Sequence, residues 1–484
     1  MRGRLYCIGV MLTMLLPIVG QAETGCQAIV KALGNTATDV VCFDSTDLTT
    51  NNPSTTPANN SLAGWPPLAF TPVTDRGVIS PAPPNQTTIT KVVPGIQVEG
   101  YFADDLTHEA RFVLRFPNDW NGKLVMAGAS GTRSEYNGDF AWSDYVLQKG
   151  YAYASQNKGV LNLRLSDATD PLGCRLNPSS TTFVHFYDND PAKPFTVWTQ
   201  YILEATVLAK KAVQHHYGKQ AKYTYVVGTS NGGYQVRRAL ETAPELYDGG
   251  VDWEGTFVDP RGPNILIDLP AVLANFPAYV ASGYDPNSQA AKNIEAAGYP
   301  PDITIPVGSA TASMWGNYNA SFWEVTMCQW QKRLDPTYDT YVAGLANYNY
   351  FQRVFATHGQ VFKNLAQIAT TGEIGKPLIT VAGTMDALLP LDRDARQYEE
   401  RVLEQKHHPA YRLYEVQNGN HIDAYAAQFP QLETIQPHAL QAFDLMVNHV
   451  ENDMPLPESQ CVPRGGTIST TPAVVGHCTS LFVP

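Results

Sequence analysis

Hydrophobic and polar positions along the chain predict short buried strands that alternate with helices. Continuous apolar, β-branched or aromatic runs of strand length are typical of parallel strands covered on both faces. They lie at residues 95–102, 110–116, 123–127, 151–155, 223–227, 250–258, 377–382 and 411–416. Apolar residues near helical spacing predict a helix from about Phe195 to Tyr217, and Gly218 supplies its stop signal. We therefore expect an α/β fold with a mostly parallel sheet and covering helices.

Two long segments do not fit this alternation. Residues 43–92 are rich in Thr, Asn, Pro and Ser, which favours irregular structure. Residues 259–373 are rich in Tyr, Trp, Asn, Ala and Pro, have helical character in places, and indicate an insertion over one end of the sheet. The predicted organisation is a signal peptide (1–22), an irregular extension (23–92), a first core part (93–258), a lid insertion (259–373), a second core part (374–460) and a tail (461–484).

The first residues have the pattern of a secretory signal. Arg2 and Arg4 precede an apolar run over residues 8–19, and the small residues Gly20 and Ala22 follow. The run is too short for a comfortable membrane span. We expect export to the periplasm or the medium, with cleavage after Ala22.

Cysteine usage agrees with export. Besides Cys7, which lies in the predicted signal, the chain has an even set: Cys26, Cys42, Cys174, Cys328, Cys461 and Cys478. An even number in an exported protein indicates disulfides, although six thiols permit about 15 pairings. Short spacing favours Cys26 with Cys42 and Cys461 with Cys478, which leaves one bridge between two large insertions. Zinc spacing is absent from the sequence, so we expect no metal at these residues.

Composition and net charge exclude some classes of binding partner. The chain has 484 residues, with 33 Lys and Arg against 45 Asp and Glu, for a net charge of −12. Nucleic acids and anionic membranes attract clustered positive charge, so neither is an expected partner. Apolar residues make up 44% and charged residues 16%, which excludes a disordered chain or a coiled coil.

One motif carries nucleophile chemistry. Gly228-Thr229-Ser230-Asn231-Gly232 follows the strand predicted at 223–227 and precedes a helix-compatible run. This is G-x-S-x-G in a strand–turn–helix context, where the turn exposes the serine and the helix N-terminus favours negative charge. A glycine-rich turn without catalytic function is the alternative.

A nucleophilic serine needs a base, and the base needs an orienting acid. Asp386 follows the strand at 377–382, and His421 follows the next strand, at 411–416. Their order after Ser230 is that of the α/β-hydrolases, and both lie where parallel sheets place ligands. Other carboxylates could supply the acid instead: Asp252, Glu254, Asp259, Asp392, Asp394 and Asp423.

An oxyanion needs two main-chain donors. We expect one from Asn231 and one from the glycine-containing loop after the strand at 123–127. In that loop Ala129 is the first candidate and Ser130 the second.

These residues resemble the tannase and feruloyl esterase family of α/β-hydrolases, and more narrowly the 3-hydroxybutyrate oligomer hydrolases. The resemblance spans roughly residues 116–463. Its supports are the segments at 118–123, 228–233, 383–390, 414–425 and 456–460. It implies an α/β-hydrolase fold with an inserted lid and a triad of Ser230, Asp386 and His421.

Two departures from tannase-type members stand out. Thr229 and Ile422 replace the cysteines that those members join beside the serine and the histidine. The lid has no acidic calcium loop, and Asp188-Asn189-Asp190 is interpreted as a turn. No metal or organic cofactor is therefore expected.

The functional expectation is an exported serine esterase that acts on hydroxyalkanoate oligoesters through an acyl-enzyme. Alternatively, the same triad could cleave feruloyl or galloyl esters, or a C–C bond between two carbonyl groups. In a different class of protein, the chain could bind a polymer without catalysing a reaction. The lid aromatics either cap the pocket or form the core of the lid itself: Trp315, Tyr318, Trp323 and Trp330.

Overall fold

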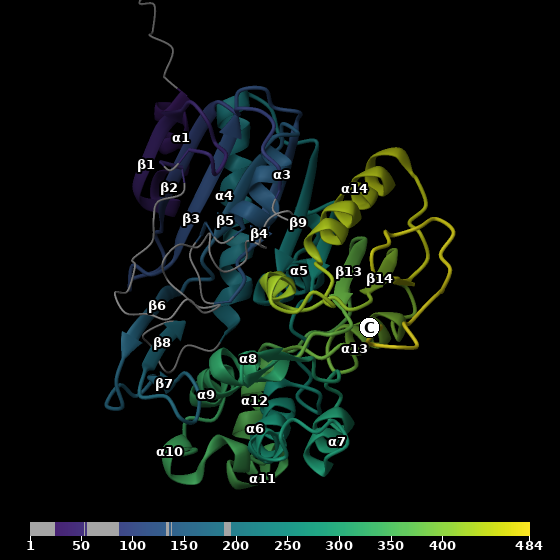
Figure 1. The fold of residues 1–484 in the computed structure, drawn as a ribbon. Coiled ribbons are helices and arrows are strands. Elements are labelled where there is room, and N and C mark those ends of the chain that lie inside the picture. Colours follow the sequence, from purple (N-terminus) through teal and green to yellow (C-terminus); the bar gives the residue numbers. More distant parts are fainter. Residues whose placement is uncertain (1–24, 53, 56–86, 132–134, 137, 188–194) are drawn as a thin grey trace, which may run out of the picture.

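The computed structural model describes residues 25–52, 54–55, 87–131, 135–136, 138–187 and 195–484 (Figure 1). The predicted signal peptide, much of the predicted extension at 23–92 and the turn Asp188-Asn189-Asp190 lie outside these described residues. No helix in the described ranges is both long and apolar enough to cross a membrane.

A sheet of ten strands forms the centre of the described chain, in the order β1-β2-β3-β5-β4-β9-β10-β13-β14-β15. The strands are β1 (Ala37–Ser45), β2 (Gly95–Phe102), β3 (Arg111–Pro117), β4 (Lys123–Gly128), β5 (Ala152–Gln156), β9 (Tyr223–Thr229), β10 (Gly249–Trp253), β13 (Leu378–Gly383), β14 (Tyr411–Val416) and β15 (Gln460–Val462). The β1-β2-β3-β5 part is antiparallel, and every pair from β5 to β15 is parallel. The mostly parallel sheet is confirmed.

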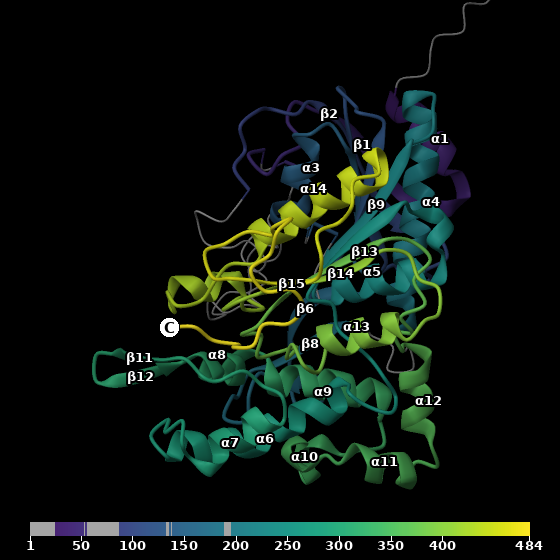
Figure 2. The ribbon, with the colours of Figure 1, turned by 90° about the vertical axis from the view of Figure 1, so that its right-hand side faces the viewer.

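Helices cover both faces of this sheet (Figure 2). On one face lie α1 (Gly25–Leu33), α4 (Thr196–Tyr217), α5 (Asn231–Thr242) and α13 (Ala395–Leu403). On the other lie α3 (Asp144–Leu147) and α14 (Gln436–Asn452). Because both faces are covered, β13 is buried along its whole length, which explains its continuous apolar sequence.

Two predicted ranges differ from the structure. The strand expected at 250–258 ends at Trp253, where the chain turns at Glu254 with a left-handed φ of 50°. The extension expected to be irregular contains α1 and β1. In β1, a mixed burial pattern and a register shift between Thr38 and Val41 hide the alternation by which an edge strand is recognised.

The long insertion forms a helical lid below the carboxyl ends of the parallel strands (Figure 1). Its elements are α6 (Ile265–Ala281), α7 (Gln289–Ala296), β11 (Thr304–Val307), β12 (Ala310–Ser313), α8 (Met314–Ser321), α9 (Trp323–Leu334), α10 (Thr340–Ala343), α11 (Tyr350–Ala356) and α12 (Gln360–Gln367). A small sheet of β6 (Leu161–Ser166), β8 (Phe183–Tyr187) and β7 (Cys174–Arg175) shares one apolar cluster with the lid, through Val184 among others.

Three disulfides are present in the described chain: Cys26–Cys42, Cys174–Cys328 and Cys461–Cys478. Cys26–Cys42 and Cys461–Cys478 are the pairs that short spacing favoured, and Cys174–Cys328 is the bridge that those two left. The second bridge joins β7 to α9, so it ties the small sheet to the lid.

Candidate active site

Ser230 lies in the turn between β9 and α5. Its φ of 57° and ψ of −122° place a residue with a side chain in a conformation that L-residues rarely adopt. The turn is held by a hydrogen bond from the Ser230 amide to the Trp253 carbonyl, at 2.8 Å. Such strain persists only where the surrounding structure enforces it, and it is common at functional sites.

The glycines around Ser230 allow the close approach of two backbones. A Cβ on Gly232 would lie 2.5 Å from the carbonyl oxygen of Gly128, and one on Gly228 would lie 2.3 Å from that of Gly232. Both distances are shorter than non-bonded carbon and oxygen atoms tolerate. The motif residues therefore let the start of α5 pack directly against the end of β4.

His421 connects Ser230 with Asp386. Its Nε2 lies 3.0 Å from Ser230 Oγ, and its Nδ1 lies 2.7 Å from Asp386 Oδ2. The other Asp386 oxygen, Oδ1, accepts hydrogen bonds from the amides of Leu388 and Leu389, at 2.7 and 2.8 Å. The three side chains predicted from the sequence thus form one hydrogen-bonded chain, in which the carboxylate faces the nitrogen remote from the serine.

The loop that carries Asp386 is hydrogen-bonded to the loop that carries His421. The Met385 amide donates to the Gly419 carbonyl at 2.7 Å, and Asn420 Nδ2 donates to the Met385 carbonyl at 2.7 Å. On Gly383, a Cβ would lie 2.3 Å from the Gly419 carbonyl oxygen. Asp386 and His421 therefore keep their relative positions through main-chain contacts as well as through their own hydrogen bond.

The loop after β4 is held by two buried polar side chains that sequence reasoning missed. Lys158 Nζ donates to the carbonyls of Ala129 and Gly131, at 2.8 and 2.5 Å. Gln235 Oε1, from α5, accepts the Ala129 amide at 2.9 Å. The Ala129 N–H is thus directed at Gln235 in this structure, which argues against its predicted role as an oxyanion donor. A lysine two residues beyond the buried strand β5 is the one signal that could have pointed to Lys158.

Asn231 occupies the first position of α5. First-turn amides have no acceptor within their own helix, and they carry the positive end of the helix dipole. The Asn231 side chain bridges this turn to the β4 loop: its Nδ2 donates to the Gly131 carbonyl at 3.2 Å, and its Oδ1 accepts from Thr256 at 3.2 Å.

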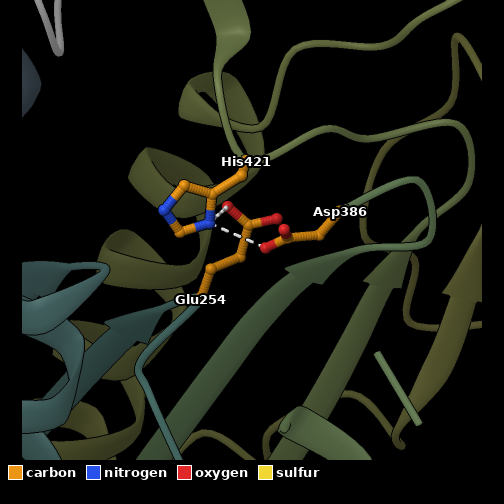
Figure 3. A group of neighbouring side chains, drawn as sticks. All are labelled: Glu254, Asp386 and His421. Atoms are coloured by element: carbon orange, nitrogen blue, oxygen red, sulfur yellow. Dashed lines mark hydrogen bonds and ion pairs between the residues drawn. The ribbon is translucent and has the colours of Figure 1, made fainter. Parts of the chain in front are cut away.

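Most of the alternative acids are engaged elsewhere. Three of them form ion pairs with arginines: Asp252 with buried Arg237 at 2.5 Å, Asp259 with Arg401, and Asp392 with Arg396. Two accept hydrogen bonds from main-chain amides: Asp394 from Phe257, and Asp423 from Ile435 and Gln436. Glu254 is the exception. Its Oε2 lies 3.5 Å from His421 Nδ1 (Figure 3).

Glu254, Asp386 and His421 are also the one set of side chains, within the described ranges, spaced as metal ligands would be. Both ring nitrogens of His421 face protein partners, Ser230 on one side and Asp386 on the other. This arrangement fits a proton-transfer chain better than a metal centre, because a metal would need one of these nitrogens as a ligand.

The lid aromatics form a packed core. Trp315, Tyr318, Trp323 and Trp330 are at most 2% exposed and belong to one cluster. Two of them also reach the site loops: Trp323 Nε1 donates to the Ala387 carbonyl at 2.7 Å, and the Tyr318 hydroxyl donates to Asn420 Oδ1 at 2.7 Å. These rings therefore support the loops of Asp386 and His421 from the lid side.

The parallel sheet, the strained serine turn and the inserted lid define the α/β-hydrolase fold. Feruloyl esterase B from Aspergillus oryzae is a similar solved structure, with a TM-score of 0.51 and 14% sequence identity over 89% of this chain and 90% of that one. At this identity the likeness concerns the fold.

The second half of the chain is similar to a more specific group. The family model described as 3HB-oligomer hydrolase (3HBOH) matches residues 320–480, a range that includes Asp386 and His421 but not Ser230. D-(-)-3-hydroxybutyrate oligomer hydrolases are 38% identical over 108 residues in Burkholderia cenocepacia (strain HI2424) and 36% identical over 131 residues in Paraburkholderia xenovorans (strain LB400). These matches cover 21% and 25% of this chain, but span only 15% and 18% of those relatives.

Proposed function

We propose that the protein is a serine esterase that hydrolyses hydroxyalkanoate oligoesters of the 3-hydroxybutyrate type. The observation that carries this proposal is the hydrogen-bonded chain Ser230–His421–Asp386 on the strained turn of an α/β-hydrolase fold. The matched range 320–480 supports the choice of substrate class, since the named relatives act on 3-hydroxybutyrate oligomers.

In the proposed mechanism, Ser230 Oγ attacks the ester carbonyl while its proton passes to His421 Nε2. Asp386 accepts the Nδ1–H bond, which keeps the imidazole in the required tautomer and stabilises its cationic form. His421 then gives the proton to the leaving alcohol, and an acyl-serine remains. A water molecule, deprotonated by His421, attacks the acyl group and releases the acid and Ser230.

The tetrahedral intermediates carry a negative oxygen that needs donors. The Asn231 amide, at the positive end of α5, is one proposed donor. The second is assigned to the neighbouring Ser130 amide rather than to that of Ala129, which donates to Gln235. Lys158, through the carbonyls it binds, would keep this loop in place and add positive charge nearby.

Export is part of the proposal. Three disulfides fit an oxidising compartment, where such bonds form and persist. Expression of the full chain, cell fractionation and N-terminal sequencing would test this, and we expect a mature product that starts after Ala22.

The catalytic proposal is tested with a fluorophosphonate probe and a substrate panel. We expect a covalent adduct on Ser230, no activity above background in Ser230→Ala, and normal activity in the exposed-loop control Ser179→Ala. Hydroxybutyrate trimers should be cleaved faster than feruloyl or galloyl esters. Faster cleavage of the aromatic esters would overturn the substrate class. A Ser230→Ala protein with full activity, or a protein that binds polyester without cleaving any ester, would overturn the mechanism.

A further inference from the structure

Glu254 is a second carboxyl group directed at the proposed catalytic histidine. It follows β10 directly, whereas Asp386 follows β13, the next strand in the sheet. Figure 3 shows both carboxyl groups reaching the same ring nitrogen of His421, with Asp386 Oδ2 at 2.7 Å and Glu254 Oε2 at 3.5 Å. His421 Nδ1 thus faces two acids that lie at neighbouring strand ends.

The backbone and one oxygen of Glu254 are firmly held. Its amide donates to the Val381 carbonyl at 2.9 Å, and its Oε1 accepts the Gly383 amide at 2.9 Å. The φ of 50° is left-handed, a conformation that costs about 1 kcal/mol or more for a residue other than glycine. With its backbone in this conformation and Oε1 bound to Gly383, the Glu254 side chain lies with Oε2 toward His421.

The second oxygen of Glu254 differs from those of Asp386. Oε2 is buried and accepts no well-formed hydrogen bond among the described residues, whereas the Asp386 oxygens accept three. The groups that act on the Glu254 carboxyl from this side are His421 Nδ1, at 3.5 Å from Oε2, and the Trp253 side chain. A glutamine would satisfy the Gly383 amide equally well through its carbonyl oxygen. The hydrogen bond to Gly383 therefore does not by itself explain a carboxyl group at this place.

Two buried carboxylates this close cannot both ionise without a large electrostatic cost. Burial is the main cause that raises the pKa of Glu254 well above its usual range, and the charge of Asp386 raises it further. The other titratable groups that interact with this pair are His421, Asp423 and Asp394, together with Tyr318 and Tyr299 from the lid. Of these, only His421 supplies a positive charge, and only while it is protonated.

We propose that Glu254 is a positioning acid that shares one negative charge with Asp386 in front of His421. This inference rests on the proposed esterase function. In the resting protein Asp386 accepts the Nδ1–H bond, while Glu254 holds a proton. When the charge of Asp386 is removed, Glu254 ionises more readily and takes over part of its role, because both groups face the same nitrogen.

The test compares Asp386→Asn, Glu254→Gln and the double variant on a nitrophenyl butyrate ester over pH 5 to 9. Loss of a triad carboxylate alone lowers kcat by about 10⁴-fold. For Asp386→Asn we expect a loss of about 10²-fold, with activity that rises with pH as Glu254 loses its proton. The double variant should lose about 10²-fold more, and its pH profile should lack the additional rise that Glu254 gives to Asp386→Asn beyond the rise common to both variants. Glu254→Gln alone should lower kcat by about tenfold and leave KM within about twofold.

Glu399→Gln is the matched control, because Glu399 is also buried with a raised pKa but lies in α13 against the C-terminal tail. It should keep the wild-type pH profile. If the folded Asp386→Asn and double variants have equal rates and superimposable pH profiles, Glu254 has only a structural role and the inference is wrong. Failure of the esterase proposal is distinguishable, since the wild-type protein would then give no fluorophosphonate adduct on Ser230.

Discussion

The hydroxyl of Tyr318 in the lid donates a 2.7 Å hydrogen bond to Oδ1 of Asn420, the residue that precedes His421. The same Asn420 oxygen accepts the Ile422 amide at 3.1 Å, and the Asn420 amide nitrogen donates to the Met385 carbonyl. One side chain thus connects the lid with the loops of His421 and Asp386. The position of the histidine depends on lid contacts made about 100 residues earlier in the chain.

This contact predicts a defect in Tyr318→Phe. Removal of the hydroxyl leaves Asn420 Oδ1 with fewer donors, so we expect a loss of about 1–2 kcal/mol in the free energy of unfolding. Because His421 follows in the chain, kcat should fall about five- to tenfold with little change in KM. Tyr350→Phe is the control: it removes a lid hydroxyl that donates to the Pro260 carbonyl at 2.6 Å, away from His421. Equal effects of both variants on kcat would contradict the prediction.

Lys158→Met tests the support of the loop after β4. The variant keeps much of the side-chain volume but loses the hydrogen bonds to the Ala129 and Gly131 carbonyls. We expect kcat to fall by about 10- to 100-fold, since removal of a single oxyanion donor costs about 10²–10³-fold and Lys158 acts through the loop. The control is Lys210→Met. Lys210 lies in α4 and donates to the Leu246 carbonyl at 2.7 Å, so its removal leaves the hydrogen bonds of the loop after β4 in place. Steady-state kinetics that are normal in Lys158→Met would contradict the proposed role.

Cys174–Cys328 and Cys26–Cys42 allow a comparison of loop lengths. Their sequence separations are 154 and 16 residues. In the chain-entropy description, a bridge over the longer loop stabilises by about 5 kcal/mol and one over the shorter loop by about 3 kcal/mol. In urea unfolding, Cys174→Ala/Cys328→Ala should therefore lose more of the free energy of unfolding than Cys26→Ala/Cys42→Ala does. The opposite order would mean that strain or residual structure, rather than loop closure, dominates.

The contact between the C-terminal tail and β14 should stabilise the folded protein more at mildly acidic pH than at alkaline pH. His477 Nδ1 lies 2.7 Å from Glu415 Oε1, and hydrogen bonding to Glu415 raises the pKa of His477 above its usual value. A histidine whose pKa is raised by folding contributes stability below its unfolded pKa, near 6.5, and this contribution disappears as pH rises through the folded pKa.

The expected result is a urea midpoint that is higher for the wild type than for His477→Gln at pH 5.5, with the difference vanishing at pH 8.5. Because the His477 side chain is half exposed, solvent screening limits the effect to less than about 1 kcal/mol. His408→Gln is the control, because the His408 side chain is exposed and its ring nitrogen Nδ1 is hydrogen-bonded to the adjacent Pro409 carbonyl, at 2.8 Å. A midpoint difference that grows with pH would refute the assignment.

Much of the sheet could be predicted from local sequence. Each apolar run predicted as a strand overlaps a strand of the central sheet, because strands buried on both faces need apolar residues at nearly every position. The edge strand β1 escaped prediction: its Thr and Asp residues alternate poorly, and its pairing with β2 is interrupted by a register shift.

For the site, local sequence was enough to predict the nucleophile motif and the order of Ser230, Asp386 and His421. The glycine spacing is a local steric requirement, and residues that follow neighbouring parallel strands meet at one edge of a sheet. The direction of individual donors and acceptors, in contrast, depends on how distant segments pack and could not be predicted. The Ala129 amide faces Gln235, Lys158 binds the loop after β4, and Glu254 shares His421 Nδ1 with Asp386. These contacts join segments that are distant in the sequence, and a difference of less than 1 Å between two acceptors depends on how those segments pack.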